Sequence, residues 1–177
     1  MCKQCEINHV YEFTNKRKLC KNCFINYFHK KVLYINRKFN MICRGDVIGY
    51  QKGNNVNSVV LKEVLNLFEE KGFIRQVGNK NKFDKLALPN NLDSESDKII
   101  HELINGNIEL NKTDKGIIKP LYLFSDREIL LYAKIKRLKF IEKKIKKDKI
   151  SLFVEDLEKK HPEIKRAIVN SYLGLNY

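Results

Sequence analysis

The chain has 177 residues, of which 43% are hydrophobic, so it can bury the core of one ordinary domain beside a small metal-binding module. Its formal net charge is +14, and no apolar run approaches the length of a membrane span, so we expect no membrane association. The polar, basic N-terminus has no apolar leader, which favours a reducing compartment, and we expect a cytoplasmic protein.

Four cysteines within the first 23 residues form two Cys-x2-Cys pairs, Cys2/Cys5 and Cys20/Cys23, separated by fourteen residues. Two thiolates three positions apart can reach one ion from a tight turn, and two such turns complete a tetrahedral site. The pattern predicts one structural zinc ion with no open position for chemistry. Four unrelated thiols or two disulfides are the alternatives. The fifth cysteine, Cys43, is expected to be a small core residue.

The positive charge falls in two blocks. Residues 1–50 hold 10 Lys or Arg against 3 Asp or Glu, and residues 115–150 hold 12 against 4, whereas the rest of the chain is close to neutral. Such blocks favour binding to a phosphate backbone, and the alternative is a lysine-rich solvent coat. The cations predicted to contact RNA phosphates are Lys30, Lys31, Arg37, Lys38, Lys143, Lys144, Lys146 and Lys147.

Apolar periodicity predicts helices and strands in alternation along the chain. The first helix carries an aromatic and aliphatic stripe that we expect to face the core. Asp93 or Ser94 is expected to cap a later helix, and Ser125 to Glu128 form a capping-box pattern for the next. Helices are predicted at 22–39, 59–71, 94–105, from 126 onward, and at 151–172 with a break at His161-Pro162, and strands at 46–50 and 83–88.

Strand–loop–helix units in succession indicate a small α/β domain with a parallel sheet. We divide the chain into two parts. Residues 1–40 form the four-cysteine module and a basic helix, and residues 41–177 form the α/β domain with its C-terminal helices.

Three short motifs occur in a recognisable order: L-C-K-N-C-F at 19–24, K-P followed by E-I-L-L-Y-A within 119–133, and L-E-K-K-H-P at 157–162. In this order they resemble the PP-loop tRNA 2-thiouridine synthases of the TtuA type and their eukaryotic wobble-uridine thiolation relatives. The resemblance implies an N-terminal zinc module followed by an adenine-nucleotide α-hydrolase fold, here truncated, and a role in tRNA 2-thiolation.

The nucleotide site that the resemblance implies is incomplete. An active PP-loop reads S-G-G-x-D-S, and its small residues and backbone N–H groups hold the ATP pyrophosphate. The corresponding stretch, 50–58, keeps Gly53 and Ser58 but has no aspartate. A second family motif, G-H-N-x-D-D-x-A, corresponds to 88–96, where Asp93 is kept and is expected to act as a helix cap. We therefore expect neither ATP nor magnesium to bind.

Sulfur chemistry in the family uses cysteines of the catalytic domain as iron–sulfur ligands or sulfur carriers. Beyond the paired cysteines this chain has only Cys43, so we expect no iron–sulfur cluster. The stretch between the second helix and Asn90 is also too short for two further strand–helix units.

These observations predict a reduced, non-catalytic, tRNA-binding subunit that forms a heteromer with an active PP-loop paralogue. A ubiquitin-like sulfur carrier would then act through that partner. Two alternatives stay open: an active but deviant ATP-dependent tRNA sulfurtransferase, and a free-standing zinc-finger protein that binds RNA or ribosomes. Co-purification with an active PP-loop partner would separate them.

Overall fold

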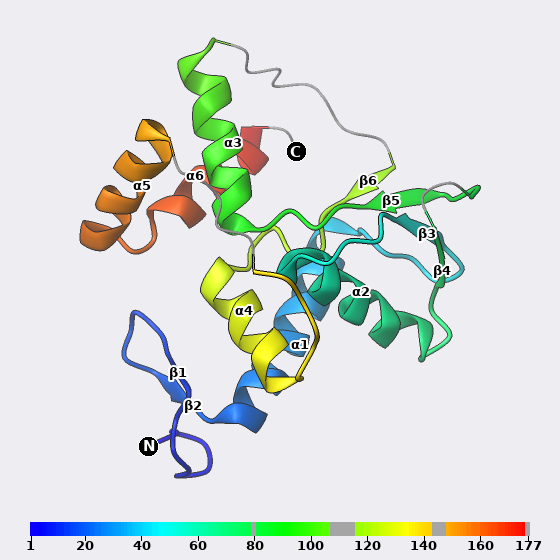
Figure 1. Cartoon of the computed structure of the whole chain (residues 1–177), viewed down its shortest axis with the longest axis horizontal. Coiled ribbons are helices and arrows are strands. Elements are labelled where there is room, and N and C mark those ends of the chain that lie inside the picture. The colour runs from blue at the N-terminus through cyan, green and yellow to red at the C-terminus, as the bar shows by residue number, and fades with distance from the viewer. Residues whose placement is uncertain (79–80, 107–115, 143–147, 176–177) are drawn as a thin grey trace.

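The structure, a computed structural model, describes residues 1–78, 81–106, 116–142 and 148–175. Figure 1 shows the small N-terminal hairpin at one end of the molecule and the four-stranded sheet at the other. The elements in chain order are β1 Tyr11–Glu12, β2 Lys18–Leu19, α1 Lys21–Phe39, β3 Val47–Tyr50, α2 Val56–Glu69, β4 Arg75–Gly78, β5 Lys85–Ala87, α3 Leu92–Ile104, β6 Ile117–Ile118, α4 Asp126–Ile135, α5 Lys149–Lys160 and α6 Ile164–Leu175.

The larger sheet has the strand order β4-β3-β5-β6, and every neighbouring pair is parallel. Parallel neighbours need crossover connections, which α2 provides between β3 and β4 and α3 between β5 and β6. The predicted fold class is confirmed: a four-cysteine N-terminal module is followed by an α/β domain with a small parallel sheet.

The connection from β4 to β5 is short, and its described part, residues 81–84, contains no helix. Both strands flank β3 and run parallel to it, and Phe83, shortly before β5, packs on β3. The ring of Phe83 lies on Gly49 so closely that a Cβ there would be 2.6 Å from a ring carbon. Because glycine has no side chain, the ring of Phe83 can pack directly on β3 at position 49. The strand expected from residue 83 begins only at Lys85, because Phe83 belongs to the connection.

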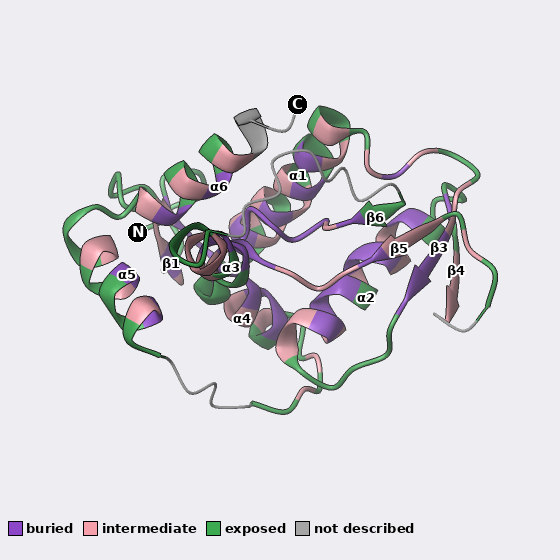
Figure 2. Cartoon of the chain, turned by 90° about the horizontal axis from the view of Figure 1, so that it is seen from above, coloured by how far each residue is buried: buried purple, intermediate pink, exposed green. Residues whose placement is uncertain are grey.

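One hydrophobic core runs from the hairpin to the C-terminal helices. Phe24 and Phe28 of α1 are fully buried, and Phe28 stacks on Tyr132 of α4 with ring centroids 4.0 Å apart. Figure 2 shows the buried faces of α1, α2 and α4 turned toward one another. The predicted core stripe of α1 is confirmed, and each such aromatic contributes about 1.5–3 kcal/mol by leaving water.

Two predicted helix starts have different outcomes. The capping box at Ser125 and Glu128 is confirmed. The cap expected at Asp93 or Ser94 is wrong, because α3 begins earlier and Asn91 caps it, accepting a hydrogen bond from the backbone N–H of Ser94 at 2.9 Å. Within the described ranges, no helix has both the length and the apolar character needed to cross a bilayer.

Candidate metal centre and nucleic-acid interface

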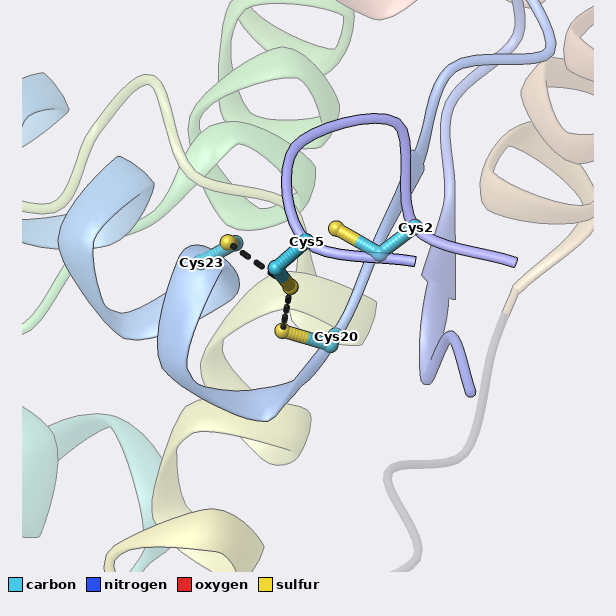
Figure 3. A group of neighbouring side chains, drawn as sticks. All are labelled: Cys2, Cys5, Cys20 and Cys23. Carbon is cyan, nitrogen blue, oxygen red and sulfur yellow. Dashed lines mark hydrogen bonds between the residues drawn. The ribbon is translucent and has the colours of Figure 1, made fainter. Parts of the chain in front are cut away.

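The four paired cysteines meet at the N-terminal end of the molecule, as Figure 3 shows. Cys2 and Cys5 flank a tight turn, Cys20 follows β2 and precedes the first residue of α1, and Cys23 lies in the first turn of that helix. All four Sγ atoms lie within 4.8 Å of one another, with Cys5 3.2 Å from Cys20 and 3.7 Å from Cys23. Four thiolates about 2.3 Å from one tetrahedral ion lie about 3.8 Å apart, so the arrangement fits a bound metal.

Backbone N–H groups favour the thiolate form, which binds metal, at two of the four cysteines. The N–H of Gln4 lowers the pKa of Cys2 to about 6, and the N–H of Cys23 lowers the pKa of Cys20. Burial raises the pKa of Cys23 to about 12, and a hydrogen bond to Cys20 raises that of Cys5. Since only thiolates bind metal, a bound cation would have to displace protons from Cys5 and Cys23.

A basic cleft of about 540 Å³ lies beside the metal centre. The metal module, α1 and α6 all contribute to its lining, and we call it the α1–α6 cleft. Lys30 and Lys38 of the predicted RNA-binding set line it, together with Arg17 and Arg166, which sequence reasoning missed. Arg166 was missed because it lies in a stretch with no net charge.

The other predicted RNA contacts lie elsewhere. Arg37 is exposed on α1 but does not line the cleft. Lys31 lines it, yet its ammonium pairs with Glu128 of α4 at 2.7 Å and its side chain is only 12% exposed. Its positive charge is therefore neutralised within the fold. The remaining four, Lys143, Lys144, Lys146 and Lys147, lie outside the described residues.

Glu128 connects the N-terminal helix to α4. Its carboxylate accepts hydrogen bonds from the Tyr27 hydroxyl at 2.7 Å, from Lys31 at 2.7 and 2.8 Å, and from the Ser125 backbone N–H at 3.0 Å. Burial lowers the pKa of Lys31, and the nearby Glu128 charge opposes that shift. The Lys31–Glu128 ion pair therefore links α1 to α4 inside the fold.

The loop after β3 occupies the position that the resemblance assigns to the PP-loop. A Cβ at Gly53 would lie 2.7 Å from the Ser58 hydroxyl, so these two retained residues touch. Asn55 caps α2 and accepts the backbone N–H of Ser58 at 2.8 Å. The Asn54 carbonyl accepts the N–H of Ile141, which follows α4, at 2.7 Å. The loop is thus bonded to other parts of the chain.

Internal ion pairs join segments that follow the carboxyl ends of β5 and β6. The carboxyl ends of β3 and β5 form the topological switch point, where α/β proteins commonly bind ligands. Asp93 of α3, the helix that follows β5, accepts the backbone N–H of Asp126, which follows β6, at 2.7 Å. It also pairs with Lys165 of α6, which is 5% exposed and pairs with Glu158 at 2.8 Å. Although burial lowers the pKa of Lys165, these two carboxylates raise it above its usual value.

Cys43 lies at the opposite edge of the sheet, before β3 begins. Its sulfur is 3.5 Å from the Asn40 side-chain oxygen and 3.6 Å from the Lys85 ammonium. Because the thiol is only half-buried in this polar setting, the expectation of a small core residue is wrong.

No protein-family model matches the chain, and no curated protein matches it by sequence. Among solved structures, the U34-tRNA thiolase NcsA from Methanococcus maripaludis, with its [4Fe-4S] cluster, is similar to it with a TM-score of 0.76. The alignment covers 98% of this chain and 86% of that chain at 20% sequence identity. The chain therefore has the fold of a U34-tRNA thiolase.

This neighbour overturns the expected cofactor set, which was one zinc ion without an iron–sulfur cluster. A chain of the same fold carries a [4Fe-4S] cluster, so the fold gives no ground for excluding one. Four thiolates are a donor set used both for zinc and for such clusters. The cysteines at positions 2, 5, 20 and 23 therefore form a candidate metal centre whose occupant has to be identified by metal analysis.

Proposed function

We propose that this chain is a tRNA-binding, non-catalytic component of a tRNA 2-thiolation system and acts beside an active PP-loop paralogue. The fold shared with a U34-tRNA thiolase supports a role in tRNA thiolation. One observation carries the non-catalytic assignment: Asp93, the acidic residue kept from the implied nucleotide site, pairs with the chain's own Lys165. The basic α1–α6 cleft supports tRNA binding.

The contacts of the loop after β3 explain why activation of a uridine carbonyl is not expected. That step needs backbone N–H groups aimed at a pyrophosphate, and even one such donor is worth about 3–4 kcal/mol in a transition state. Here the N–H of Ser58 bonds to Asn55, and Asp93 bonds to Asp126 and Lys165. A phosphate could use the N–H of Ser58 only by breaking its bond to Asn55, and a metal ion could bind Asp93 only in competition with Lys165.

Sulfur delivery meets a second obstacle. Outside the metal centre the sequence offers only the Cys43 thiol, which precedes β3, whereas the loop follows that strand. A four-residue strand is about 13 Å long, so this thiol and the loop lie at opposite edges of the sheet. In the proposed heteromer, the paralogue supplies the nucleotide and sulfur chemistry, and any ubiquitin-like sulfur carrier docks through it.

The second candidate is an active but deviant tRNA sulfurtransferase, and the fold neighbour's [4Fe-4S] cluster is the observation that favours it. The test combines tRNA, ATP, magnesium and a sulfur donor with the chain alone, with the paralogue recovered from the same cells, or with both. Adenylated and 2-thiolated uridine are scored by mass spectrometry. We expect turnover only when the paralogue is present and faster turnover when the chain is added.

Turnover by the chain alone would replace the non-catalytic assignment with the deviant enzyme. A chain that binds RNA, captures no PP-loop protein and leaves paralogue turnover unchanged would instead be a free-standing RNA- or ribosome-binding protein.

A further inference from the structure

Two neighbouring rows of α1 form the floor of the α1–α6 cleft. Residues four apart lie on one face of a helix, and Asn26, Lys30, Tyr34 and Lys38 form such a row. All four are exposed, which places an aromatic ring one helical turn from a cation on either side. The second row contains Cys23, Tyr27, Lys31 and Ile35, and joins the floor to the metal centre.

Two other segments form the walls. Arg17 comes from the turn between β1 and β2, and its guanidinium lies 5.7 Å from the ring centre of Phe13. Arg166 and Asn170 lie one helical turn apart on α6. None of the described residues that line the cleft is Asp or Glu, so these residues give the cleft a positive potential that attracts anions.

Tyr34 distinguishes this cleft from a merely basic surface. This residue is 59% exposed, whereas the aromatic residues Phe24 and Phe28 on the same helix are fully buried. An exposed aromatic ring between cations is the arrangement with which proteins bind unpaired nucleotides, since every base can stack on it and each phosphate can meet a cation. The cleft volume of about 540 Å³ lies within the range of small-ligand sites.

The geometry points to a binding site for an unpaired RNA nucleotide in the α1–α6 cleft. The base stacks on Tyr34, and the flanking phosphates contact Lys30, Lys38 and Arg166. The inference rests on the proposed tRNA-binding function and adds a base contact to the phosphate contacts predicted from the sequence. A regular duplex keeps its bases stacked inside the helix, so it can use the cations but not the ring.

The test measures binding of the metal-loaded full chain to a labelled single-stranded oligouridine, to an RNA duplex of the same length and to tRNA, by fluorescence anisotropy at fixed salt. Tyr34→Ala is expected to weaken single-strand binding about tenfold and leave duplex binding unchanged, because stacking is lost. Tyr34→Phe keeps the ring and should bind like the native chain. Lys30→Glu should weaken binding of all three RNAs, and the matched control Lys62→Glu, exposed on α2, should not.

The outcomes separate this inference from the proposed function. Normal tRNA binding together with unchanged single-strand binding by Tyr34→Ala would overturn the nucleotide site and leave the tRNA-binding role standing. Equal losses for single strand and duplex in Tyr34→Ala would also overturn it, because they indicate no stacking. A native chain that binds none of the three RNAs would overturn both.

Discussion

Replacing Glu128 by glutamine tests how much the ion pair between α1 and α4 contributes to the free energy of unfolding. The substitution keeps the size of the side chain but leaves the Lys31 ammonium without its counter-charge. The two side chains are 3% and 12% exposed, so this is a buried ion pair, for which removal of one partner costs about 3–5 kcal/mol. Loss of the proton from Lys31 would cost a similar amount, because deprotonating an ordinary lysine at pH 7 costs about 4.6 kcal/mol. Both values approach the total stability of a small domain, about 5–15 kcal/mol.

The assay is urea unfolding of the metal-loaded full chain, with metal content measured for each variant. Asp156→Asn is the matched control, because its pair with Lys159 is exposed and should contribute nothing measurable. The double variant Lys31→Met with Glu128→Gln removes both charges, and its cost should be smaller than the sum of the two single costs by more than about 1 kcal/mol. A loss below about 1 kcal/mol in Glu128→Gln, at full metal content, would refute the reasoning.

The pH dependence gives a second readout of the same pair. Burial lowers the pKa of Lys31 in the folded chain below its ordinary value of 10.5, so the unfolded chain binds more protons between the two values. Stability contributed by this group therefore rises with pH through that interval. Without the carboxylate of Glu128 the folded pKa falls further, and in Glu128→Gln the rise should begin at a lower pH than in the native chain.

Two further predictions concern the metal centre and the central strand. Cys20→Ser is expected to lose the bound metal and unfold the N-terminal module, because the free energy of metal binding contributes to folding. Zinc, iron and acid-labile sulfide are measured per chain, which also identifies the metal. Full metal retention by the variant would contradict the assignment. Gly49→Ala should cost about 1–3 kcal/mol by forcing Phe83 off β3, measured by urea unfolding. Gly78→Ala is its control, since its new Cβ meets no heavy atom within 4 Å; equal costs would show that the ring is not the cause.

Local patterns predicted the features that depend on local spacing. The paired cysteines converge because each Cys-x2-Cys turn already aims two thiols at one point, and α1 packs as expected because its apolar period matches the helix. The strand β4 was missed because its sequence, R-Q-V-G, has a single large apolar residue, and β6 was missed because two residues are too few to show a pattern. Asn91 was missed as a cap because Asp93 and Ser94 offered equally good capping side chains.

Contacts between distant segments could not be read from the sequence. Lys30 and Lys31 are neighbours of identical type, yet one is exposed and the other is paired with a glutamate 97 residues away. The α1–α6 cleft likewise needs Arg17, α1 and Arg166 together, and only the fold brings these segments to one place. A count of positive charges therefore located the basic helix, but it could not tell which of its cations line the cleft.

The contacts of Asp93 bear on how this fold can be stable without a nucleotide. In a site built to bind phosphate and metal, a buried carboxylate without its ligand would carry a desolvation cost. Here α6 supplies Lys165, which is buried against both Asp93 and Glu158, and the N–H of Asp126 satisfies a further carboxylate oxygen. The segments that follow β5 and β6 therefore have their charges compensated by the chain itself. Because these charges are compensated within the chain, the fold does not need a bound pyrophosphate at the loop that contains Gly53. The chain's proposed contribution to tRNA thiolation is made at the α1–α6 cleft.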